Sequence, residues 1–148
     1  MGAGTLTIIL AFAGGVGMAL QAPTNAALAR GVGSPITAAL ISFMVGSAAL
    51  GIAAVFNRAP IDPAALRAVP WYAWTGGLYG AFFVAVAAYG APLIGVAALL
   101  TAAVAGQIVA GVGLDQIGAL GLPRHPAGLA RLIGAGLVVG GAALVRWG

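Results

Sequence analysis

The sequence contains no cysteine, no lysine and no glutamate, and its charged residues are six arginines and two aspartates. Without cysteine, the chain has no disulfide framework, thiol chemistry or sulfur-bound metal site. The only histidine, His125, lies between Pro123 and Pro126 and away from any carboxylate in the sequence, so no metal site is expected. A soluble domain carries roughly 25% charged residues, against 5% here. These shortages exclude a soluble globular fold and a disordered chain. The net charge of +4 is scattered over the arginines, which excludes a nucleic-acid module.

Apolar residues make up 62% of the chain, and the mean hydropathy is +1.12, which predicts an integral membrane protein. Because almost every segment is apolar, the interruptions locate the helices. Ser34-Pro35 and Asp62-Pro63 are helix starts, with an N-cap followed by proline. Gly90-Ala91-Pro92 is a tight break. About 20 residues cross a bilayer, and the predicted spans of one transmembrane domain, residues 1–148, are 5–28, 35–56, 70–89, 92–114 and 127–145.

The arginines show only a small asymmetry across such a bundle. Four of them fall on the side of the N-terminus and two on the other: Arg58, Arg67, Arg124 and Arg131 against Arg30 and Arg146. Arginine-rich loops stay in the cytoplasm, so this split favours a cytoplasmic N-terminus. A difference this small also allows insertion in both orientations.

Polar and aromatic residues within the predicted spans are the candidates for binding a solute. On the first helix three polar residues share a face interrupted by Pro23, and they serve either to repair the backbone or to bind a ligand. An aromatic stripe on the third helix either packs or lines a substrate cavity. An amide near the middle of the fourth helix needs a partner. The candidate substrate-binding residues are Gln21, Thr24, Asn25, Tyr79, Phe82 and Gln107.

Two further features allow more than one interpretation. Asp115 is the only carboxylate that the predicted spans could embed in the membrane. It is either an interfacial contact for Arg124 or Arg131, or a proton-coupling site. Gly136 and Gly140 form a GxxxG motif on the last helix, which either packs within the bundle or forms the dimer contact.

Five stretches of the sequence are distinctive in combination: QAPTNAALAR at 21–30, GSP at 33–35, AALISFMVG at 38–46, the run 101–118 with its GQ and LDQIG, and RLIG at 131–134. Together they resemble the YdcZ-type family of the drug/metabolite transporter superfamily, over essentially the whole chain. The resemblance implies a half-unit similar to one half of an EamA-like ten-helix transporter. It also implies assembly as an antiparallel homodimer, as a pair with a homologous subunit, or as a fusion. The small multidrug-resistance branch of the superfamily uses a first-helix glutamate for proton exchange, and this chain has no glutamate.

These observations predict an all-α inner-membrane protein with five transmembrane helices. The expected function is secondary transport or export of a small metabolite or drug-like solute, by alternating access in a dimer. A small dual-topology ion channel and an accessory subunit of a paired transporter are the alternatives. The spans contain no nucleophile–base pair and no metal-ligand set, so we expect no enzyme, cofactor or metal. The expected partners are the lipid bilayer, a second copy or a paired subunit, and the solute, but no nucleic acid.

The small arginine asymmetry predicts dual topology. Single cysteines introduced at Gly2 and at Ala59 should each be labelled partly from both sides of the membrane, because no strong charge bias sets one orientation. An impermeant thiol reagent applied to intact cells and to inverted vesicles measures this. Labelling from the cytoplasmic side alone would contradict dual topology and favour an inverted hetero-partner.

Overall fold

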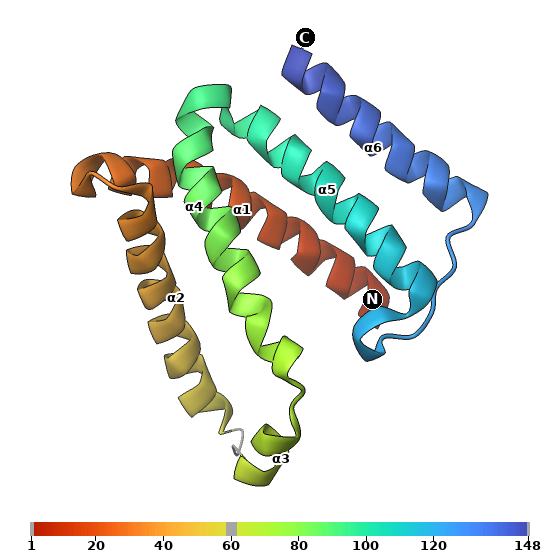
Figure 1. Ribbon diagram of the computed structural model, residues 1–148, viewed down its shortest axis with the longest axis horizontal. Helices are drawn as coiled ribbons and strands as arrows, with labels where there is room; N and C mark the ends of the chain where they lie inside the picture. The colour runs from red at the N-terminus through yellow and green to blue at the C-terminus, as the bar shows by residue number, and fades with distance from the viewer. Residues whose placement is uncertain (1, 59–61, 148) are drawn as a thin grey trace. The chain divides into compact units, whose positions relative to one another are not determined.

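The computed structural model describes residues 2–58 and 62–147, and every regular element in them is a helix (Figure 1). The position of Ala59, chosen above for labelling, lies outside the described residues. Among the described residues, five helices are long and apolar enough to cross a membrane. The elements are α1 (Ala3–Val32), α2 (Pro35–Asn57), α3 (Pro63–Ala68), η1 (Trp71–Thr75), α4 (Gly76–Ile94), α5 (Val96–Ile117), η2 (Ala119–Gly121) and α6 (Leu129–Trp147).

Two predicted helix starts are present with their caps. The Oγ atom of Ser34 accepts a hydrogen bond from the N–H of Thr37 at 3.2 Å, and Pro35 is the first residue of α2. In the same way, Asp62 Oδ1 accepts from the N–H of Ala64 at 2.8 Å and begins α3. Each cap satisfies an N–H group that has no acceptor within its own helix.

The predicted break at Gly90-Ala91-Pro92 is wrong, because α4 continues through Pro92 to Ile94. Pro92 is two residues from the end of the helix, where its missing N–H removes only one of the last backbone hydrogen bonds. The break falls instead at Gly95, whose φ of 81° and ψ of 152° belong to a region that essentially only glycine adopts. The fourth membrane helix therefore begins at Val96 rather than at residue 92.

The first helix also continues through its proline. Pro23 lies inside α1, and the two ends of α1 run in different directions (Figure 1), as a proline-induced bend produces. Next to it, the hydroxyl of Thr24 donates to the carbonyl oxygen of Leu20 at 2.7 Å. The hydroxyl group is therefore satisfied by its own helix. In the lipid core this is necessary, because no water is available as a hydrogen-bond partner.

The described residues form two compact units, which divide after Pro92. In the first unit, α1 packs against α2, and small residues are buried between the helices. Ala29, Ala38 and Ala88 form one buried cluster contributed by α1, α2 and α4. Small side chains allow helices to approach closely in lipid, where packing replaces the hydrophobic effect between helices. Gly80 serves the same purpose, since a Cβ there would lie 3.3 Å from the ring of Phe43.

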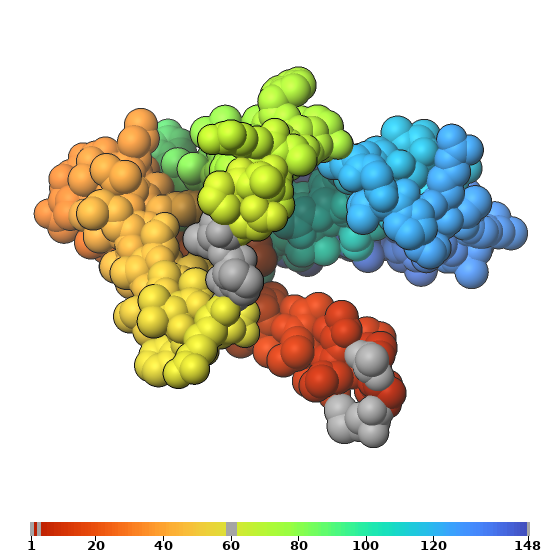
Figure 2. Space-filling model, turned by 90° about the horizontal axis from the view of Figure 1, so that it is seen from below, coloured from red at the N-terminus to blue at the C-terminus, as the bar shows by residue number. Residues whose placement is uncertain are grey.

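In the second unit, α5 packs against α6. The connection between them, residues 118–128, contacts α5 through η2 and forms part of the light blue surface of Figure 2. It begins at Gly118, which has a φ of 63°. A Cβ at this position would lie 2.6 Å from Cγ of Arg124, so glycine is needed both for the turn and for the space.

The backbone at Gly95 predicts a specific cost for a methyl group. Gly95→Ala should lower the free energy of unfolding by about 1–3 kcal/mol, because alanine is strained at this φ and ψ. A Cβ here meets no atom within 4 Å, so the loss reports strain rather than collision. Thermal unfolding in detergent, followed by circular dichroism, measures it. The control Gly77→Ala, inside α4 and equally open, should not destabilise the protein; equal loss in both variants would contradict the argument.

Candidate functional site

The three polar residues predicted to share a face of α1 have different environments. Asn25 is buried, with 3% of its surface exposed, whereas Gln21 is half-buried and Thr24 is exposed. The buried side of α1 consists otherwise of Ala22, Ala26 and Ala29, which we call the alanine face. Asn25 is therefore the one polar side chain set among the small residues of this face.

The side-chain amide of Asn25 lacks a partner. Its Nδ2 atom is buried and has no hydrogen-bond acceptor among the described residues. Leaving a buried donor unsatisfied costs about 1–3 kcal/mol. The Thr24 hydroxyl, which the sequence assigned either to backbone repair or to a ligand, bonds to Leu20. The pair thus separates: the Thr24 hydroxyl is satisfied within its own helix, whereas Asn25 retains a free donor.

The two aromatic candidates of α4 are both exposed. Tyr79 is 71% exposed and Phe82 is 74% exposed. The hydroxyl groups of Tyr79 and Thr75 are hydrogen-bonded at 3.1 Å. Both residues belong to the same unit as Asn25, but they are not on the buried side of α4.

An apolar groove that the sequence did not reveal runs between α2 and α4. It consists of two adjoining hollows of about 380 and 350 Å³ that share Ile36 and Ala85. Its other lining residues include the aromatic side chains of Phe43, Phe82 and Tyr89. Of the sequence candidates, only Phe82 lines it. The aromatic residues of both helices were the only sequence signal of such a groove. That α2 and α4 line it together is seen only in the tertiary structure.

Gln107 lies in the second unit, exposed on α5. A separate hollow of about 340 Å³ lies between α5 and α6 and is almost wholly apolar, with Thr101 as its one hydroxyl-bearing residue. That hydroxyl donates to the carbonyl oxygen of Ala97 at 2.9 Å, within its own helix. Gln107 does not line this hollow.

Asp115 forms an ion pair near the end of α5. Its Oδ2 atom accepts from Nη1 of Arg131 at 3.2 Å, so of the two arginine partners left open, the contact is with Arg131. The side chains are partly exposed, at 38% for Asp115 and 49% for Arg131. Exposed ion pairs contribute about 0–1 kcal/mol, so the pair orients these groups more than it stabilises the fold.

The glycines of the GxxxG motif are open on α6. A Cβ at Gly136 or at Gly140 would meet no atom within 4 Å. Neither glycine is used for close packing within the second unit, although α6 packs against α5. Among the described residues, no group of three or more histidine, cysteine, aspartate or glutamate side chains lies close enough to hold a metal ion.

The sequence model of one protein family, described as "Putative inner membrane exporter, YdcZ", matches residues 6–144. No curated protein and no solved structure matches the chain. The match extends over all five candidate membrane helices. It agrees with the resemblance carried by the stretches around residues 21–46 and 101–134. The chain belongs to the YdcZ family of inner-membrane exporters of the drug/metabolite transporter type.

Proposed function

We propose that this chain is one half of an exporter that moves a small solute by alternating access in an antiparallel dimer. Five membrane helices place the two ends of a chain on opposite sides of the bilayer. Two inverted copies then form ten helices related by an axis in the membrane plane, the symmetry on which many secondary transporters are built. The five candidate spans and the membership of an exporter family support this arrangement.

The observation that carries the proposal is the unpartnered amide of Asn25. A buried donor without an acceptor destabilises the chain that contains it. A solute carbonyl or carboxylate that accepts this hydrogen bond would recover the loss during the transport cycle. Asn25 is accordingly the central donor of the proposed site, with the half-buried Gln21 one helical turn before it.

The other candidate residues are proposed to contact the solute as well: Gln107 through its amide on α5, and Tyr79 and Phe82 through their aromatic rings on α4. A site built of amides and aromatic rings suits a neutral, zwitterionic or aromatic solute better than a bare cation. A coupling role for Asp115 requires that its ion pair with Arg131 opens during the cycle.

The dimer contact is proposed at Gly136 and Gly140. Both positions are open, and small residues spaced by four allow two helix backbones to approach closely.

Neither an ion channel nor an accessory subunit is favoured by a particular contact in the structure. Conductive current in place of saturable flux would identify a channel. Flux only in the presence of a second polypeptide would identify a paired subunit.

Replacement of Asn25 tests the site. Asn25→Leu keeps the side-chain shape and removes the unpaired donor, so it should preserve or raise the stability by up to about 1–3 kcal/mol. The same change should lower flux roughly tenfold or more, which corresponds to the lost hydrogen bond to the solute. Thermal unfolding and flux in liposomes, with tryptophan and indole as probe solutes, are measured on one preparation.

Matched variants distinguish the loss of a hydrogen bond to the solute from a general effect of replacing a polar residue by leucine. Asn57→Leu makes the same substitution at the exposed end of α2 and should retain flux. Gln21→Leu and Gln107→Leu should lower flux, as Asn25→Leu does. If these three site variants all keep wild-type flux per folded protein, the polar groups only pack and the proposed site is wrong.

A bulky side chain at Gly140 tests the dimer contact. Gly140→Leu should abolish the crosslinked dimer while leaving helix content unchanged, because a Cβ there meets no atom of its own chain. Crosslinking in membranes and circular dichroism in detergent give the two readouts. The control Gly46→Leu, at an open glycine of α2, should keep the dimer. An unchanged dimer fraction in Gly140→Leu would place the contact on another helix.

A further inference from the structure

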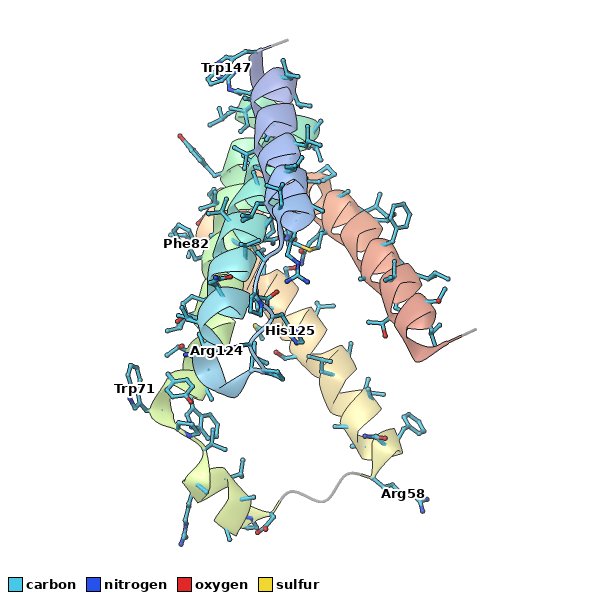
Figure 3. The ribbon with its side chains drawn as sticks, turned by 90° about the vertical axis from the view of Figure 1, so that its right-hand side faces the viewer. Arg58, Trp71, Phe82, Arg124, His125 and Trp147 are labelled. Atoms are coloured by element: carbon cyan, nitrogen blue, oxygen red, sulfur yellow. The ribbon has the colours of Figure 1, made fainter. Side chains whose placement is uncertain are left out.

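The connection between α5 and α6 carries a group of basic residues at one end of the helix pair. Arg124 and His125 lie within it (Figure 3), and Arg131 lies in the first turn of α6. Because α5 and α6 are both candidate membrane spans, their connection lies at the level of the lipid headgroups. At that depth, the main fixed charges outside the protein are the phosphates of the lipids.

The side chain of Arg124 is held in place by contacts with the backbone at the end of α5. Its Nε atom donates to the carbonyl oxygen of Ile117 at 3.1 Å, and its Cγ atom lies over Gly118, where a Cβ would approach it to 2.6 Å. The side chain is exposed. Among the described residues, no acceptor is hydrogen-bonded to its terminal nitrogens. A guanidinium fixed in this way presents its remaining donors in a set orientation.

Arg131 is held by a second set of acceptors. Its Nη1 atom donates to Asp115 Oδ2 at 3.2 Å and to the carbonyl oxygen of His125 at 3.1 Å. The N–H of His125 in turn donates to the backbone carbonyl of Asp115 at 2.9 Å. Asp115 offsets one of the two arginine charges, so the group keeps a net positive charge.

Apolar side chains project from the same connection. Leu120 is 64% exposed and Leu122 is 55% exposed. Leu120 has a φ of 58°, an uncommon conformation for a residue with a branched side chain. Basic groups beside exposed leucines match the two parts of a phospholipid, a charged headgroup and the apolar chains below it.

We propose that the α5–α6 connection binds the phosphate of an anionic phospholipid, with Arg124 and Arg131 as its donors and Leu120 and Leu122 against its acyl chains. Guanidinium groups bind phosphate through paired N–H donors. Charge complementarity selects an anionic lipid over a zwitterionic one. This inference does not depend on the transported solute or on the dimer contact.

Native mass spectrometry of the purified full chain tests the inference, with phosphatidylglycerol and phosphatidylcholine of identical acyl chains as probes. The dissociation constant for phosphatidylglycerol should be at least about fivefold lower, from the attraction expected per basic residue. Arg124→Gln should reduce the difference to less than about twofold. The control Arg146→Gln, at the opposite end of α6, should leave the difference unchanged.

A second variant moves the preference in the other direction. Asp115→Asn keeps an acceptor for Arg131 and removes the opposing charge, so the preference for phosphatidylglycerol should rise. This test stands even if Arg124→Gln does not fold. Equal affinity for the two lipids in the wild-type chain would overturn the proposal, as would an unchanged preference in Asp115→Asn. Displacement of phosphatidylglycerol by an equal concentration of inorganic phosphate would also overturn it, because the site would then bind free anions.

Discussion

The lipid core offers no hydrogen-bond partners, so every backbone polar group that lies in it must be satisfied within the protein. This constraint accounts for the way the helices of this chain begin, bend and end. The side chains of Ser34 and Asp62 cap the N–H groups at two helix starts. The last carbonyls of α5 accept from the side chain of Arg124 and the backbone of His125. Within α1, a threonine hydroxyl bonds to a carbonyl near the proline.

The same solvent removes the usual driving force for packing one helix against another, since lipid is as apolar as leucine. Apart from Val84 and Leu99, every buried apolar side chain of the described residues is an alanine. Large apolar residues are exposed instead. Against this background Asn25 is an exception, because it occupies a buried position on the alanine face without satisfying its amide. A polar residue that weakens the packing of a membrane helix is a natural candidate for function.

Local signals predicted most of the helices, and their failures have local causes. Ser34-Pro35 and Asp62-Pro63 predicted helix starts correctly, because an N-cap and a proline act within one turn. Pro92 was misleading because a proline in the last turn removes only one hydrogen bond, and Gly95 ends α4 instead. For Asp115, the sequence left two partners open. The connection after α5 brings Arg131 to it, whereas Arg124 bonds to the backbone.

Composition and the spacing of interruptions by themselves determined that this is a helical membrane protein with five candidate spans, because hydropathy and caps are properties of neighbouring residues. Which polar groups remain unpaired was decided only by the tertiary structure. Gln21, Thr24 and Asn25 are equivalent in sequence, as polar residues at positions i, i+3 and i+4 of one helix. In the structure, Gln21 is half-buried, Thr24 bonds to its own helix and Asn25 is buried without an acceptor. Burial and hydrogen bonding depend on which helices pack against a residue, and sequence spacing along one helix does not specify its neighbours.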